Sequence, residues 1–113
     1  MKQSPVLEFE SSAFSVEPGE DEATNPGVYG RALAEWLAEQ LRGAGVRAGK
    51  VVPEDFGWLV PIEGESPALF VACANADGAR DRWRVYACDR GEERSPAELA
   101  ALFSSLRRCL EPA

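Results

Sequence analysis

The chain has 113 residues and a formal net charge of −7, with 45% hydrophobic and 27% charged residues. A domain of this size buries enough surface to form a hydrophobic core without disulfides or metals, and the composition is typical of soluble globular proteins. Histidine is absent, which excludes imidazole acid–base catalysis and histidine-dependent nucleophiles from this chain. The acidic balance disfavours nucleic acid and anionic membranes, and we expect neither as a partner.

The N-terminal quarter is the most acidic part, because residues 1–28 carry a net charge of −5. Residues 6–10 alternate apolar and acidic side chains, which predicts an edge strand, with a bulge near Ser11 and Ser12. A first helix is expected to begin near Asn25 and Pro26, since Asn suits an N-cap and Pro the first helical position.

The first helix is expected to end at Gly43 and Gly45. Its apolar face consists of large side chains at helical spacing: Tyr29, Leu33, Trp36, Leu37 and Leu41. On this pattern we expect Trp36 to belong to the core.

Four strand-like runs follow, at residues 46–52, 56–62, 68–75 and 82–88. The turns between them are expected at residues 53–55, at 64–67 and at Asp77-Gly78. A capping box at residues 95–98 then starts a second helix, whose stripe is Leu99, Leu102, Phe103, Leu106 and Leu110. The order β-α-β-β-β-β-α predicts a single α+β domain over residues 1–113: a mostly antiparallel sheet of four to five strands with two helices on one face.

Turns centred on residues 64–65 and 77–78 predict which side chains face the helices. The covered face is expected to hold Trp58, Val60, Ile62, Phe70, Ala72, Ala74, Trp83, Val85 and Ala87. The open face is expected to hold Leu59, Leu69, Val71, Cys73, Arg84, Tyr86 and Cys88. So apolar an open face predicts an interface formed by Leu59, Leu69, Val71 and Tyr86, with Arg84 at its rim.

The three cysteines, Cys73, Cys88 and Cys109, are an odd number without C-x-x-C spacing. We therefore expect reduced thiols rather than disulfides or a zinc site.

Two acidic groups are candidate sites. Glu54 and Asp55 are a possible carboxylate pair for acid–base catalysis, but neighbours on an extended chain point to opposite sides, which favours a loop role. Glu20, Asp21 and Glu22 offer oxygen ligands for a divalent cation, but their spacing does not match an EF-hand. We expect them to form a solvated loop that aids partner binding, with no metal and no cofactor.

The most distinctive string is Pro53-Glu54-Asp55-Phe56-Gly57-Trp58. Together with residues 18–27, Tyr29-Gly30-Arg31 and residues 71–75, it resembles a family of small, uncharacterised bacterial proteins that carry an E-D-x-G-W motif. The resemblance covers most of the chain, and because that family has no assigned activity it implies no mechanism.

The sequence contains neither an apolar run long enough to span a membrane nor a signal-like start, so we expect a cytoplasmic location. The favoured hypothesis is a protein-binding domain without catalytic activity, such as an inhibitor, an immunity-type protein or a regulatory protein. One alternative is a small-molecule-binding protein or carboxylate-based enzyme, with its site between the sheet and the acidic loops. Another is a homodimer that forms through the open sheet face.

Overall fold

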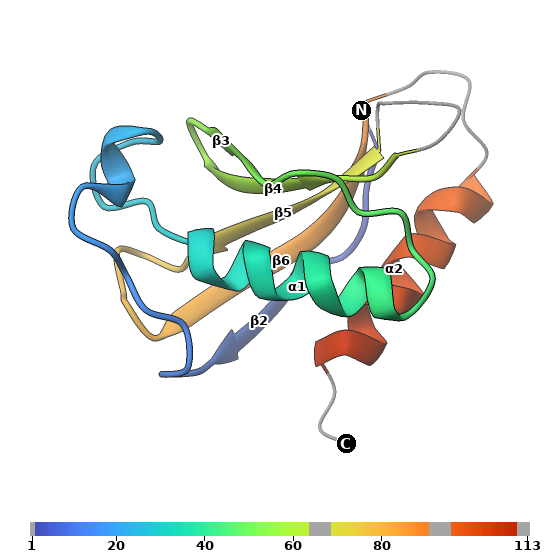
Figure 1. The fold of residues 1–113 in the computed structure, drawn as a ribbon, viewed down its shortest axis with the longest axis horizontal. Coiled ribbons are helices and arrows are strands. Elements are labelled where there is room, and N and C mark those ends of the chain that lie inside the picture. The colour runs from blue at the N-terminus through green and yellow to red at the C-terminus, as the bar shows by residue number, and fades with distance from the viewer. Residues whose placement is uncertain (1, 64–68, 91–95, 111–113) are drawn as a thin grey trace.

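The computed structural model describes residues 2–63, 69–90 and 96–110. Its elements are β1 (Lys2–Gln3), β2 (Leu7–Glu10), the short 3-10 helix η1 (Glu20–Glu22), α1 (Arg31–Gly43), β3 (Val52–Glu54), β4 (Gly57–Pro61), β5 (Leu69–Asn75), β6 (Arg82–Asp89) and α2 (Pro96–Leu110). All strand pairs are antiparallel, in the order β1-β6-β5-β4-β3, and β2 also pairs with β6. Both helices lie on one face of the sheet (Figure 1), which confirms the predicted α+β class and element order.

β1 and β2 act as one edge strand that is interrupted by a bulge. Gln3 pairs with Cys88 and Leu7 with Val85, which leaves three residues on the N-terminal side opposite two on β6. Pro5 suits such a position because it has no N–H to donate to the ladder. The bulge thus lies earlier in the chain than the sequence predicts.

The connection between β5 and β6 contains the expected tight turn. Asp77 and Gly78 both have positive φ angles, of 50° and 73°, and the Ala79 N–H donates to the Ala76 carbonyl at 2.9 Å. This is the geometry of a type I′ turn, for which Asp-Gly is a favoured pair. The Ala76 N–H also donates to the Arg82 carbonyl, so five residues lie between these two positions.

That odd-numbered loop decides which side chains of β5 face the helices. A turn centred on residues 77–78 would pair Trp83 with Ala72, whereas the observed partner of Trp83 is Asn75. Because side chains alternate along a strand, the change moves β5 to the opposite face. The predicted faces of β4 and β6 are confirmed, but that of β5 is wrong: Leu69, Val71 and Cys73 lie in the core, and Phe70, Ala72 and Ala74 on the open face.

The core lies between the covered face of the sheet and the two helices. The helices contribute Leu33, Ala34, Leu37, Ala38 and Leu41 from α1, and Leu102 and Leu106 from α2. Trp83 is fully buried, its Nε1–H donates to the Ser11 carbonyl at 3.0 Å, and Phe14 packs edge-on against its ring. Within the described residues, neither helix is long and apolar enough to cross a membrane.

Residues 46–52 do not form the predicted strand. They contain only an isolated bridge, between Ala48 and Ile62, before β3 begins. Pro61 explains the difference, because in the register of this bridge it lies opposite Gly49 and has no N–H to donate to the Gly49 carbonyl. The carbonyls of Ala48 and Gly49 accept instead from the Arg42 guanidinium on α1, at 3.0 Å each.

The register of β5 is tested by shortening one valine in the core and one at the surface. We expect Val71→Ala to lower the free energy of unfolding by about 2 kcal/mol, because Val71 is 0% exposed and its lost methyl groups leave a cavity. The matched change Val52→Ala, at an exposed position of β3, is expected to cost less than about 0.5 kcal/mol. Urea denaturation measures both, and equal effects would contradict the observed register.

Candidate functional site

A loop formed by residues 17–30 is fastened to one end of the sheet by Asn75. The Asn75 Oδ1 accepts a hydrogen bond from the Tyr29 N–H at 2.9 Å. Its Nδ2 donates to the carbonyls of Gly27 and Ala79, at 2.9 and 2.7 Å. The Asn75 main chain adds a bond from its N–H to the Tyr29 carbonyl. One buried amide therefore joins loop 17–30, β5 and the β5–β6 turn.

Glu20, in the same loop, caps helix α1. The helix begins at Arg31 with Gly30 as its N-cap residue, and Gly30 has no side chain that can satisfy the free N–H groups there. The Glu20 Oε2 accepts from the N–H groups of Gly30 and Arg31, at 2.8 and 3.1 Å. A carboxylate at a helix N-terminus also interacts favourably with the helix dipole. Glu20 is 6% exposed, so the prediction that it is solvated is wrong.

Two further polar residues of loop 17–30, Asp21 and Asn25, also have structural roles. The Asp21 Oδ2 accepts from the Gly27 N–H at 2.9 Å, whereas Glu22 is exposed. Asn25, which the sequence predicts as the N-cap of α1, instead donates from Nδ2 to the Asp55 carbonyl at 2.8 Å. The helix therefore starts later than predicted, because Asn25 binds the β3–β4 turn while Gly27 and Tyr29 bind Asn75.

Two glycines allow the backbone to approach closely at this end of the sheet. Gly30 and Gly57 have φ angles of 152° and 155°. A Cβ would lie 2.8 Å from the Cys73 carbonyl oxygen at Gly30 and 2.5 Å from it at Gly57. Two of the strings behind the family resemblance, Tyr29-Gly30-Arg31 and the one ending in Gly57-Trp58, thus both meet β5 here. Their glycines have a packing role that requires no ligand.

The predicted carboxylate sites do not converge. Glu54, the last residue of β3, pairs with Gly57 of β4, and Asp55 lies exposed in the turn between them. Among the described residues there is no group of three or more acidic or cysteine side chains that could hold a metal ion.

The open face of the sheet does not carry the predicted exposed stripe. Of its four apolar members, Leu69 and Val71 lie in the core instead, because β5 has the opposite register. Leu59 does lie on the open face but is 5% exposed, and Tyr86 beside it is half-buried. The prediction of a contiguous exposed apolar stripe on this face is therefore wrong.

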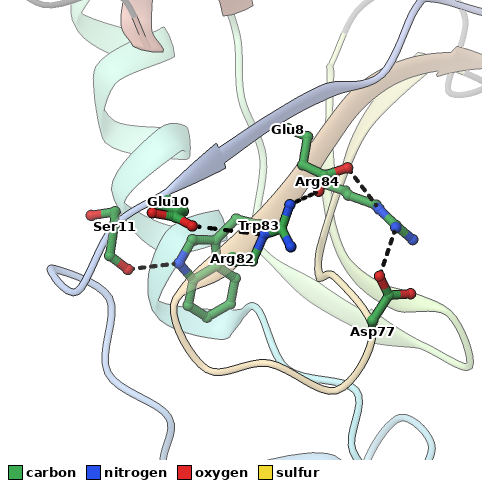
Figure 2. Close-up of polar contacts among 7 residues, drawn as sticks. All are labelled: Glu8, Glu10, Ser11, Asp77, Arg82, Trp83 and Arg84. Carbon is green, nitrogen blue, oxygen red and sulfur yellow. Dashed lines mark hydrogen bonds and ion pairs between the residues drawn. The ribbon is translucent and has the colours of Figure 1, made fainter.

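Arg84 belongs to a row of ion pairs on the open face of β2 and β6 (Figure 2). Glu8 bridges two arginines, at 2.9 Å from Arg82 and 3.3 Å from Arg84. Arg84 also reaches Asp77 at 3.4 Å, and Arg82 lies 4.0 Å from Glu10. These side chains are substantially exposed, so each pair contributes little to stability but orients its partners.

The three cysteines are free, as predicted. Burial raises the pKa of each thiol, at Cys73, Cys88 and Cys109. The thiol form is therefore favoured near neutral pH, and the thiolate is the form that reacts as a nucleophile.

A partly apolar hollow in the described surface surrounds Trp36. It has a volume of about 540 Å³ and is lined by Phe9, Glu10, Phe14, Ala32, Trp36 and Leu110, from β2, the following loop, α1 and the end of α2. Trp36 is 36% exposed, and its ring lies 5.5 Å from that of Phe14. We call this feature the Trp36 hollow.

The sequence prediction that Trp36 is a core residue is wrong, and its direction on the helix explains why. At about 100° per residue, the buried positions of α1 occupy an arc about 140° wide, from Leu33 to Ala38. Trp36 lies about 60° outside that arc. Its position at i+3 from Leu33 matches the apolar spacing, but on the side of the helix that the sheet does not reach.

A second groove, of about 710 Å³, lies on the other side of α1. Half of its lining residues are charged, including Arg31, Glu35 and Glu39 along the helix and Lys50 opposite. Trp58 forms part of its wall, and the Arg31 guanidinium lies 5.7 Å from the centre of the Trp58 ring. Its three basic and three acidic side chains balance, so the groove as a whole selects neither sign of charge.

No protein-family model, curated protein or solved structure matches the chain.

The capping role of Glu20 is tested against its exposed neighbour. We expect Glu20→Ala to lower the free energy of unfolding by about 2 kcal/mol, because the N–H groups of Gly30 and Arg31 lose a charged acceptor. Glu22→Ala removes the same charge from an exposed side chain and is expected to change stability by less than about 0.5 kcal/mol. Denaturant unfolding of the two variants is the measurement, and equal stabilities would rule out the cap.

The close approach at Gly57 is tested against a second glycine with a positive φ angle. Gly27 has a φ of 82°, but a Cβ there would meet nothing within 4 Å. We expect Gly27→Ala to cost about 1 kcal/mol from backbone strain alone. Gly57→Ala is expected to cost at least about 2 kcal/mol more, because its Cβ overlaps the Cys73 carbonyl and its φ of 155° is more strained for alanine. Thermal and urea unfolding give the difference, and similar costs would contradict the close packing.

Proposed function

We propose that the chain is a small cytosolic protein-binding domain without catalytic activity of its own, and that its partner binds at the Trp36 hollow. The proposal keeps the function favoured by the sequence but moves the binding site from the open face of the sheet to the side of α1.

The observation that carries the proposal is the exposed indole of Trp36. Tryptophan is among the residues most enriched at binding hot spots, which lie in apolar surroundings that exclude water. Here Phe9, Phe14 and Leu110 provide such surroundings. A large, partly exposed aromatic side chain in an apolar hollow indicates a surface that another protein covers.

Charge favours a basic partner. The chain carries a net charge of −7, and Glu10, whose side chain is 77% exposed, lies at the hollow. A negative surface potential accelerates association with a positive protein and slows it with a negative one. The chemistry of the hollow therefore suits a partner that presents an apolar side chain within a basic segment.

The proposal is tested by comparing two exposed aromatic residues. Wild-type protein, a Trp36→Ser variant and a Phe56→Ser variant are immobilised, and host-cell proteins retained by the wild type are identified and their affinities measured by calorimetry. Phe56 is the control, because it is exposed in the β3–β4 turn and does not line the hollow. We expect Trp36→Ser to weaken binding by roughly 30-fold or more and Phe56→Ser to leave it unchanged.

Circular dichroism is used to verify that both variants are folded. A partner that binds the folded Trp36→Ser variant as tightly as the wild type would contradict the proposal. Sedimentation of the chain alone examines self-association, and a dimer that Trp36→Ser dissociates would make a second copy the partner.

A further inference from the structure

We propose, on the basis of the function proposed above, that the partner binds as an additional β-strand along the free edge of β2. In the described residues, β2 pairs only with β6, and no strand lies beyond it (Figure 1). An extended peptide can therefore continue the sheet there, through main-chain hydrogen bonds.

The backbone groups that face this edge can be identified from the ladder. The Ser11 N–H donates to the Asp81 carbonyl, and Phe9 pairs with Trp83 two residues earlier. Hydrogen-bonded groups alternate along an antiparallel strand, so the N–H and C=O groups of Glu8 and Glu10 point away from β6. These two residues supply the donors and acceptors of the free edge.

The Trp36 hollow lies where side chains of an added strand would be placed. Leu7 and Phe9 face the helices, as their partners Val85 and Trp83 do, yet they are only half-buried. Their unburied side is the one without a neighbouring strand. Because Phe9 and Trp36 both line the hollow, an apolar side chain on the helix-facing side of an added strand would enter it.

The opposite side of an added strand would face the acidic side chains of β2. Glu8 is held by Arg82 and Arg84, whereas the Glu10 side chain is 77% exposed and lies 4.0 Å from Arg82 (Figure 2). Opposite charges on adjacent strands attract, and like charges repel. The edge therefore favours a strand with lysine or arginine at alternate positions and disfavours β2 of a second copy.

The other edge of the sheet is a poorer acceptor. β3 has three residues, and its central residue, Pro53, has no N–H to donate. Short edge strands that contain proline are a common protection against strand addition. Of these two edges, β2 is therefore the one at which a strand can be added.

The inferred ligand is an extended segment in which basic and apolar residues alternate. The probe is a blocked nonapeptide, Lys-Val-Lys-Leu-Lys-Val-Lys-Leu-Lys, and its control has glutamate in place of every lysine. We expect the basic peptide to bind and to slow hydrogen exchange at the amides of Glu8 and Glu10, as followed by NMR, and the acidic peptide to do neither.

Two substitutions at Glu10 separate backbone pairing from charge. Glu10→Gln removes the charge and keeps the N–H, whereas Glu10→Pro removes both. Proline is tolerated there because the N–H of residue 10 points away from β6. We expect Glu10→Pro to weaken the basic peptide's binding by about tenfold beyond the effect of Glu10→Gln. Unchanged protection of the amides in β6 shows that the sheet is intact.

The outcomes distinguish this inference from the function on which it rests. Binding that depends on Trp36 but leaves exchange at Glu8 and Glu10 unchanged would overturn strand addition and retain the Trp36 hollow as the site. Slowed exchange at these amides that persists in Trp36→Ser would support edge pairing and overturn the role of Trp36. If neither peptide binds, strand addition by a basic segment is overturned, and the capture experiment with Trp36→Ser still decides the proposed function.

Discussion

The side-chain amide of Asn75 is the contact on which much of the molecule depends. By binding Tyr29 and Gly27 it holds loop 17–30 against β5, and this fixes where α1 begins. The apolar arc of α1 from Leu33 to Ala38 packs against the sheet, which buries the leucines at 33, 37 and 41. Trp36 lies about 60° outside that arc and is left at the surface.

The negative charges of the N-terminal region serve two different purposes. The carboxylates of Glu20 and Asp21 accept hydrogen bonds from backbone N–H groups of their own loop, those of Gly30 and Gly27. Glu8 and Glu10, in contrast, are on the surface of β2, and the arginines of β6 orient them. Net charge alone cannot separate these roles, because it counts a buried cap and an exposed side chain equally.

The two edges of the sheet are protected to different degrees. β3 is short and contains proline, whereas β2 is interrupted only before its first residue, by the bulge at Pro5. The same edge lies beside the Trp36 hollow, so free backbone groups and apolar surface occur together. This combination of directional hydrogen bonds and an adjacent pocket is the basis of recognition by strand addition.

The sequence by itself determined the α+β class, the order of the elements, the Asp77-Gly78 turn and the core-facing sides of β4 and β6, because these follow from local periodicity and turn chemistry. Tertiary structure alone decided which side chains of β5 face the core. The number of loop residues after Ala76 sets the register of β5, and a shift of one residue moves every side chain to the opposite face of the sheet. Tertiary structure also decided the roles of Glu20 and Trp36. The partners of Glu20 are ten and eleven residues away, and the exposure of Trp36 depends on how far the sheet extends beneath α1. Local patterns do not contain such distances, so the candidate binding site emerged only when the chain was folded.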